Sequence, residues 1–368
     1  MKLIDDYRQQ IDTVDTELLK LFIERMEISR KIGAYKKEHG IAVLDSIREK
    51  EILTKVDEKA GKDMRPYSQV LFSTLFDLSR TYQESALPPE STLCKIITDT
   101  LVDNDQNFPQ YATIACQESE SQYANIACDR IFTEHSIQSV AGLDKIISSV
   151  SKGLCRYGLL QVINGYPDSI ARIYGLLSRF DLKIVRSTRL NIGLSLAVKL
   201  STIKYEDFID YFKQPSKDIT NTAASNTDDA AKIISETNGE DVAAITSNSF
   251  GNNHWLECIE SSVQDKDTPY ARFICFSKNL EIYPGANRSS FMLIVPQRAM
   301  YHILGRLHAS GINIINLECH SMLYRETLNR CYFDLEISPY SNDFIRLISY
   351  LENICDEFHY LGSYLEIT

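Results

Sequence analysis

The chain has 368 residues, more than one hydrophobic core usually organises, so two or three domains are expected. Hydrophobic residues make up 44% of the sequence and charged residues 24%, as in soluble globular proteins. The net charge of −11 and the pI near 5.2 argue against a protein that binds nucleic acid or lies on a membrane surface.

Residues 1–88 are predicted to form an all-helical domain, because apolar residues recur there at the three- and four-residue spacing of one helix face. We expect a first helix to about Glu38, a second over 45–59 and a third over 66–85. The helix breakers in this stretch are few: Gly33, Gly40, Gly61 and Pro66. The first helix would span roughly 50 Å, more than a small monomeric core can cover, and therefore predicts pairing with a second chain as a homodimer.

The remaining chain is predicted to hold a linker and two further domains. Residues 89–110 are rich in Pro, Ser, Asn and Asp, which is typical of a linker. Over 111–283, short apolar runs such as YGLLQVI and RFICF alternate with helical stretches, which predicts an α/β domain. Over 284–368 the expected order is strand, helix, strand, strand, helix, strand, a ferredoxin-like α+β module.

The nine cysteines are scattered, odd in number and without a CxxC pair. Zinc, a redox dithiol and a disulfide framework are therefore not expected, and a reducing compartment fits best. The N-terminus has no apolar leader segment, and no window approaches eighteen uninterrupted apolar residues. We expect a cytoplasmic protein that uses no metal and no other cofactor.

Arg25 and Lys36 are expected to project from the same face of the first helix. They are eleven residues apart, about three turns, which places their Cα atoms roughly 16 Å from each other. Two long cationic side chains that lean together at this spacing can hold a small dianion. Arg8 lies seventeen residues before Arg25, about 100° around the helix from that face, so it is better placed to serve the equivalent site of a dimer mate.

Polar residues of the other two predicted helices extend this candidate site. Asp45, Arg48 and Glu49 share a face of the second helix, and Ser79 and Gln83 share a face of the third. The set holds cations, a hydroxyl, an amide and carboxylates, but no His, Cys or other plausible nucleophile. Such a lining suits the positioning and charge stabilisation of a polyanion rather than covalent or general-base catalysis.

Each of these charges also has an ordinary structural interpretation. Arg25, Lys36 and Arg48 can be solvated helix charges with partners one turn away. The sequence SIRE, 46–49, fits a capping box, in which Glu49 would only cap the second helix. Spacing alone leaves both interpretations open.

Residues 3–85 strongly resemble the all-helical chorismate mutases, whose homodimers interlock long helices. The segments that carry the resemblance are YRQQIDTVDTELLKLFIER (7–25), KIGAYKK (31–37), VLDSIREKE (43–51) and LSRTYQ (78–83). Eight positions expected to line the family's pocket hold the expected residue types: Arg8, Arg25, Lys36, Asp45, Arg48, Glu49, Ser79 and Gln83. The resemblance implies that Arg25 and Arg8 of the partner subunit clamp the two carboxylates of chorismate, assisted by Arg48 and Ser79.

The same resemblance implies roles for the other residues of the set. Lys36 and Gln83 would hydrogen-bond the ether oxygen, where negative charge builds as the C–O bond breaks, while Glu49 and the Asp45 region would receive the ring hydroxyl. The implied reaction is the Claisen rearrangement of chorismate to prephenate in phenylalanine and tyrosine biosynthesis. Because this reaction is intramolecular, orientation and a preorganised field can supply most of its acceleration.

The domain order and the middle segment resemble the bifunctional chorismate mutase–prephenate dehydratases of phenylalanine synthesis, which implies a periplasmic-binding-protein-like fold for 111–283. YARF (270–273) is similar to the family's Asn-x-Thr-Arg-Phe signature, and keeps Arg272 and Phe273. The threonine proposed to protonate the departing hydroxyl is replaced by Ala271. In the segment 157–177, only Asn164 survives of the family's Pro-Ile-Glu-Asn-Ser/Thr.

Further departures from the family pattern also indicate a loss of dehydratase chemistry. Glu118 and Ser121 stand where the family has glycines that allow close backbone approach, and Leu194 stands where a histidine is usual. Since Ala271 has no donor for the leaving oxygen, we expect a retained scaffold without dehydratase activity. Arg272 has two interpretations: a carboxylate ligand, or a salt bridge that holds the end of its strand.

The segment LHASGINIINLECHSM (307–322) resembles the ACT-type regulatory domain that follows in these enzymes, which binds phenylalanine at a dimer interface. Glu318 keeps the first residue of the family's Glu-Ser-Arg-Pro. The family's Gly-Ala-Leu is replaced by Arg298, Ala299 and Met300, and the bulky Arg298 at the glycine position would obstruct the amino-acid pocket. An ACT-like module with altered specificity is therefore expected here.

Three interpretations of the whole chain follow. The first is a working chorismate mutase joined to a degenerate dehydratase and ACT-like region, which serves dimerisation, docking of a downstream pathway enzyme, or regulation by a ligand such as an aromatic amino acid. The second is a fully bifunctional chorismate mutase/prephenate dehydratase that makes phenylpyruvate. The third is a non-catalytic protein that senses an aromatic metabolite.

Overall fold

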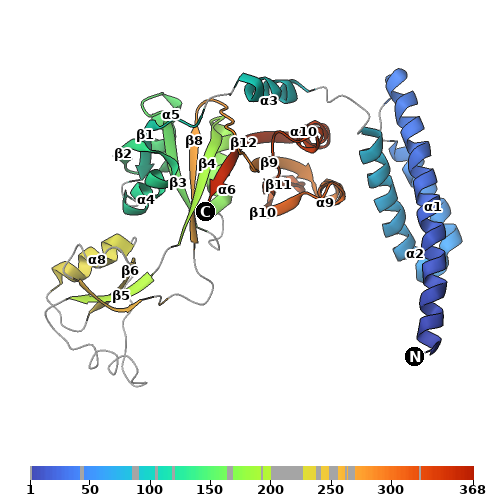
Figure 1. Ribbon diagram of the computed structural model, residues 1–368, viewed down its shortest axis with the longest axis horizontal. Helices are drawn as coiled ribbons and strands as arrows, with labels where there is room; N and C mark the ends of the chain where they lie inside the picture. The colour runs from blue at the N-terminus through green and yellow to red at the C-terminus, as the bar shows by residue number, and fades with distance from the viewer. Residues whose placement is uncertain are drawn as a thin grey trace. The chain divides into compact units, whose positions relative to one another are not determined.

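The computed structural model divides the chain into two compact units, one of Met1–Asp103 with Arg288–His359 and one of Asn104–Asn287 with Tyr360–Thr368 (Figure 1). The described residues are 2–41, 45–84, 91–103, 107–117, 121–163, 169–191, 194–199, 227–237, 242–247, 256–261, 263, 270–322 and 325–368. In these ranges, no helix combines the length and the apolar character needed to cross a membrane.

Two long helices, α1 (Lys2–Glu38) and α2 (Ser46–Glu84), pack against each other at the N-terminus of the first unit. Gly61 interrupts α2 with a non-helical backbone (φ 71, ψ 170), which only glycine adopts without strain. A break between the two predicted helices is therefore confirmed, but it is confined to Gly61, and residues 62–65, predicted to lie between the helices, are helical. Only a narrow face of α1 is covered, and Ser29 and Gly33 lie buried along it while most of its apolar residues remain exposed.

The segment 89–110, predicted as a linker, contains a helix, α3 (Thr92–Asp103). Its apolar face buries Cys94 and Ile97, and α3 packs on α10 (Asn342–Ile354) of the same unit. The Ser91 hydroxyl starts the helix by accepting a hydrogen bond of 2.8 Å from the N–H of Cys94. The sequence did not reveal this helix because its apolar pattern is short and lies between polar, proline-rich segments. The helix is stabilised by its packing on α10.

The C-terminal elements occur in the predicted βαββαβ order. They are β9 (Arg288–Pro296), α9 (Gln297–Ala309), β10 (Asn313–Met322), β11 (Arg325–Glu336), α10 and β12 (Glu357–Ile367). β11 pairs antiparallel with both β10 and β9, and α9 contacts all three strands. The assignment of this region to the ACT type stays a prediction.

The second unit is α/β, as predicted. Its main strands lie in the order β4-β8-β3-β1-β2, with β1 parallel to β2 and β3, and β8 antiparallel to β3 and β4. A separate antiparallel sheet has the order β6-β5-β7. The strands are β1 (Tyr111–Gln117), β2 (Glu134–Val140), β3 (Tyr157–Ile163), β4 (Lys183–Asn191), β5 (Leu194–Lys199), β6 (Ala243–Ser247), β7 (Leu256–Ser261) and β8 (Tyr270–Ser277).

The helices of this unit are α4 (Ser121–Ile131), α5 (Leu143–Ser151), α6 (Ser169–Arg179) and α8 (Thr227–Glu236). The end of β12 also belongs to it, because Leu365, Glu366 and Ile367 pair in parallel with Arg186, Ser187 and Thr188 of β4. The last residues of the range 284–368 are thus built into the α/β unit.

Candidate active site

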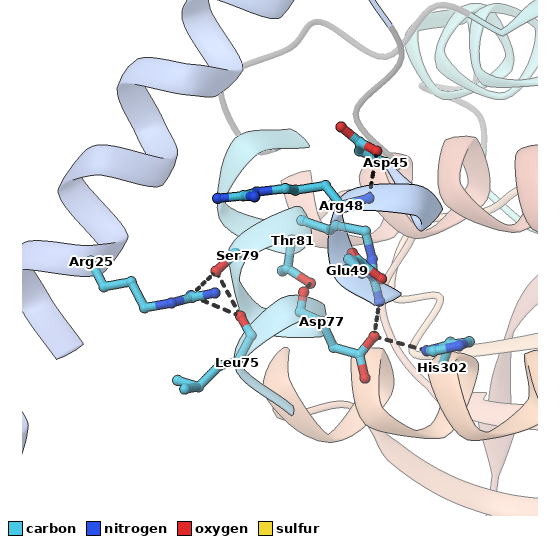
Figure 2. Close-up of polar contacts among 10 residues, drawn as sticks. Arg25, Asp45, Arg48, Glu49, Leu75, Asp77, Ser79, Thr81 and His302 are labelled. Atoms are coloured by element: carbon cyan, nitrogen blue, oxygen red, sulfur yellow. Dashed lines mark hydrogen bonds and ion pairs between the residues drawn. The ribbon is translucent and has the colours of Figure 1, made fainter. Parts of the chain in front are cut away.

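Arg25 of α1 reaches across to α2, where it contacts neutral groups. Its Nη1 donates to the hydroxyl of Ser79 and, at 3.1 Å, to the backbone carbonyl of Leu75 (Figure 2). The guanidinium carbon also lies 5.8 Å from the centre of the Phe76 ring. Burial lowers the pKa of Arg25, yet an arginine stays protonated at neutral pH. Within the described residues no carboxylate pairs with Arg25, so its half-buried charge is not neutralised.

Gln83 lies at a close contact between α1 and α2. Its side chain is buried, and its Oε1 has no hydrogen-bond partner in the described part of the chain. A Cβ on Gly33 would lie 3.0 Å from both Cβ and Cγ of Gln83, and 3.1 Å from its Cα. Gly33, one turn beyond Ser29 on the buried face of α1, therefore sets the distance between α1 and the Gln83 amide.

Lys36 is half-buried one turn beyond Gly33, on the same helix face as Arg25. Arg25, Ser79 and Gln83 thus lie at the α1–α2 contact, and Lys36 lies on the same face of α1 as Arg25. The contact offers a half-buried cation, a hydroxyl and a buried amide, with a second cation on the same helix face. The use of these residues as a substrate site stays a prediction.

Asp45 and Arg48 lie at the start of α2 and are exposed. The Asp45 carboxylate accepts a hydrogen bond of 3.0 Å from the N–H of Arg48, so Asp45 caps the helix. The Arg48 side chain pairs with Glu51 at 3.1 Å. Within one chain, Arg48 therefore pairs with a carboxylate one turn away, as the ordinary structural interpretation of this residue expects.

Glu49 contacts Arg80, a residue that the sequence did not single out. The Arg80 guanidinium bridges the carboxylates of Glu49 and Asp77, and its side chain is only 12% exposed. This pairing replaces the capping role considered for Glu49. Arg80 lies inside the LSRTYQ segment, but nothing in its spacing distinguished it from a solvated arginine.

Arg8 does not reach this cluster within one chain. Its side chain is 73% exposed and pairs with Asp5 at 3.4 Å. Because α1 is one uninterrupted helix, Arg8 lies roughly 26 Å from Arg25 along the helix axis. A role for Arg8 in this site therefore requires a second copy of the chain.

The predicted degenerate dehydratase residues lie on β8, except Asn164, which is outside the described residues. Ala271 and Phe273 are fully buried. Arg272, also buried, pairs with Glu366 at 3.2 Å and donates to the hydroxyls of Tyr364 and, at 3.3 Å, Tyr174. Of the two interpretations of Arg272, the structure contains the salt bridge.

The possible effector residues lie on two elements of the first unit. Arg298, exposed, and Ala299 and Met300, more buried, form the first turn of α9. Glu318 lies on β10, where its carboxylate is 3.8 Å from the His320 ring. Their use by an effector stays a prediction.

Comparison with known proteins identifies two segments of the chain. The family model for chorismate mutase type II matches residues 7–84, and the model for prephenate dehydratase matches 114–281. A bifunctional chorismate mutase/prephenate dehydratase of Buchnera aphidicola subsp. Baizongia pistaciae is 25% identical over 285 residues, which cover 74% of each chain. The chain belongs to the bifunctional chorismate mutase–prephenate dehydratase family. It is an enzyme with a chorismate mutase domain at its N-terminus.

Solved structures support the fold of the remainder of this family member. A prephenate dehydratase of Arthrobacter aurescens in complex with L-Phe is similar with a TM-score of 0.54 and 18% identity, covering 68% of this chain and 89% of that one. A structure described as GqqA, a novel type of quorum-quenching acylase, is similar with a TM-score of 0.55 and 19% identity, covering 69% and 97%. At this identity the likeness establishes the fold alone.

The Gly33–Gln83 contact leads to a first prediction. Gly33→Ala should lower kcat/KM for chorismate about tenfold, because the new methyl group pushes Gln83 away and small misplacements in a preorganised site are costly. Gly33→Val should lower it further. Helix propensity alone would favour alanine by about 1 kcal/mol, so the loss cannot come from a weaker helix. The exposed Lys37→Ala serves as the control, and wild-type kcat/KM in Gly33→Ala would show that the close approach is not needed.

Proposed function

We propose that the chain catalyses the rearrangement of chorismate to prephenate at the α1–α2 contact, as part of aromatic amino acid biosynthesis. The proposal rests on one observation: across the described ranges, two polar groups at this contact, one charged and one neutral, lack the partners that they need. The described carboxylates leave the half-buried cation of Arg25 unneutralised, and the buried Oε1 of Gln83 lacks a partner. Both are costly unless a ligand completes them. A small dicarboxylate supplies the anion for Arg25, and an ether oxygen pairs with Gln83 once the amide is turned so that its N–H takes the place of Oε1.

Arg25 is proposed to bind one substrate carboxylate, helped by Ser79, while Arg8 of the partner subunit binds the other and Arg48 assists. Arg25 is held by two hydrogen bonds from Nη1 to Ser79 and Leu75, so its guanidinium direction is fixed before substrate binds. Arg48 pairs with Glu51 at the surface and must exchange that contact for the substrate. Binding both carboxylates of the substrate holds its two reacting carbons close together. Restricting the substrate to this conformation is the main entropic cost of the reaction.

Lys36 and Gln83 are proposed to act on the ether oxygen. The Lys36 ammonium supplies a positive charge where negative charge develops, and the buried position of Gln83 strengthens its hydrogen bond. A half-turn of the Gln83 amide exchanges its oxygen and nitrogen, so the same position presents an N–H to the ether oxygen. Glu49, with the Asp45 region, accepts the hydrogen bond of the ring hydroxyl. No covalent step and no proton transfer is needed.

A homodimer is proposed because α1 leaves an apolar stripe uncovered. The exposed fractions of Leu3, Tyr7, Ile11, Val14 and Leu18 range from 53% to 64%. A patch of this length on a single helix is typical of a surface that another chain covers. A second copy is the occupant we propose, since it brings Arg8 to the site that lacks it.

Subunit complementation tests the shared site. Arg8→Ala and Arg25→Ala should each lose most mutase activity alone, because each site then lacks one carboxylate ligand. Co-expression of the two variants should restore about a quarter of wild-type activity, since half of the dimers are mixed and one of their two sites is intact. Co-expression of Arg25→Ala with Lys36→Ala is the control and should restore nothing, since both residues come from the same chain. Absence of recovery in the first mixture would contradict the shared site.

For residues 111–283 we propose a dehydratase-type scaffold without dehydratase activity. Ala271 offers no proton donor, and Arg272 is already paired with Glu366, a carboxylate that it shares with Arg189. The family match over 114–281 favours the alternative, a bifunctional enzyme that also makes phenylpyruvate. We propose that this region and the ACT-like segment 284–368 serve regulation by an aromatic amino acid, dimerisation or docking of a downstream enzyme.

One assay separates these functions. Incubation of the full chain with chorismate at neutral pH should produce prephenate and no enzymatic phenylpyruvate, as followed by chromatography against an enzyme-free control. Lys36→Ala should lower kcat on the order of a hundredfold or more, because its charge stabilises the transition state. Phenylpyruvate at enzymatic rates would establish the bifunctional alternative. Absence of prephenate would sink the mutase proposal and favour a non-catalytic sensor.

A further inference from the structure

Helix α9 of the C-terminal segment contacts α2 directly beside the candidate active site. His302 Nδ1 lies 2.9 Å from a carboxylate oxygen of Asp77, and Arg306 donates to the Thr81 hydroxyl at 3.1 Å (Figure 2 shows the first contact). A Cβ on Gly305 would lie 3.4 Å from the other Asp77 oxygen, so the glycine allows α9 to approach closely. The Arg306 side chain is buried in this contact.

The contact continues to Glu49 through two ion pairs. Asp77 shares the Arg80 guanidinium with Glu49, and the exposed fractions of the three side chains are 17%, 12% and 25%. Charge-assisted hydrogen bonds in such a partly buried place are stronger than at the surface and fix the geometry of both partners. The orientation of Glu49 therefore depends on Arg80, that of Arg80 on Asp77, and that of Asp77 on His302.

We propose that Arg80 and Asp77 are positioning residues for Glu49, and that His302 of α9 holds them in place. This inference rests on the proposed mutase function.

Variants of His302 test the inference in the full chain. His302→Ala should lower kcat/KM for chorismate about tenfold, within the range of coupling effects carried by packed contacts. His302→Asn, which keeps an N–H near the position of Nδ1, should retain most of the activity. Tyr301→Ala, whose side chain is 77% exposed on the same helix, is the matched control and should behave as wild type.

A double-mutant cycle separates positioning from loss of structure. In a Glu49→Gln background, His302→Ala should cause little further loss, because the group it positions has already changed. The same tenfold loss in both backgrounds, or no loss in the wild-type background, would overturn the inference. Inactivity of the wild type would instead mean that the proposed function itself has failed.

An independent observation concerns Cys319 and Cys331. They lie directly opposite each other on β10 and β11, with their Sγ atoms 2.6 Å apart. Directly opposed residues on antiparallel strands have the separation that a disulfide spans. Cys331 is buried, whereas Cys319 is exposed on β10, the end strand in the sheet order of the described strands.

The geometry points to a reversible disulfide between Cys319 and Cys331, with a small disulfide such as oxidised glutathione as oxidant. The Cys319 thiolate attacks one glutathione sulfur and releases a first glutathione thiolate. The Cys331 thiolate then attacks the mixed disulfide and releases the second. Two electrons pass from the protein sulfurs to glutathione disulfide, and the two thiol protons end on the released glutathiones. The bond would tie together the hairpin that carries Glu318.

Alkylation and peptide mass spectrometry after incubation with oxidised glutathione test this site. The Cys319–Cys331 bond should form, disappear with dithiothreitol, and fail to form in Cys319→Ser. Cys258→Ser, which removes another exposed thiol, should leave it unchanged. Full alkylation of both cysteines after oxidation, or persistent glutathione on Cys319 without the internal bond, would overturn the assignment.

Discussion

The helical part of the structure depends on one constraint: α1 must approach the C-terminal half of α2 closely enough to bury Gln83 and half-bury Arg25. Gly33 makes the approach possible, and the hydroxyl of Ser79 and the carbonyl of Leu75 hold Arg25 there. These partners orient the guanidinium but do not neutralise it. The fold therefore retains an electrostatic cost that a bound anion lowers.

Arg272 shows the opposite outcome for the same residue type. It is more buried than Arg25, yet a carboxylate, that of Glu366, lies 3.2 Å away, and two tyrosine hydroxyls accept hydrogen bonds from it. Glu366 also pairs with Arg189 at 2.8 Å, so these ion pairs hold β8 and β4 to β12. Whether an arginine is structural or binds a ligand thus depends on whether its nearest acceptors are charged. These acceptors come from distant parts of the chain, so no single segment of sequence reveals them.

The sequence was informative wherever the decisive interaction is local. Helix periodicity predicted α1 and the two halves of α2, with Gly61 among the helix breakers between them. Spacing predicted that Arg25 and Lys36 share one helix face and that Ser79 and Gln83 share another, but not that the two faces meet. The sequence was uninformative where partners are distant in the chain. Arg80 finds Glu49 31 residues away, and His302 finds Asp77 225 residues away, so neither pairing has a pattern that periodicity can detect. Helix α3 was missed because its short apolar face lies between polar flanks and is stabilised by packing on α10.

The length of α1 has a physical reason under the proposed dimer. Arg8 and Arg25 belong to one rigid helix and lie roughly 26 Å apart, so one chain cannot supply both to a ligand the size of chorismate. A stiff helix that extends from its own site to that of its partner solves this problem without a flexible loop, and its exposed apolar stripe stabilises the pairing. Dimerisation and substrate binding then use the same element. A change that shortens or bends α1 would weaken both, even though the Arg25–Ser79 contact itself stayed intact.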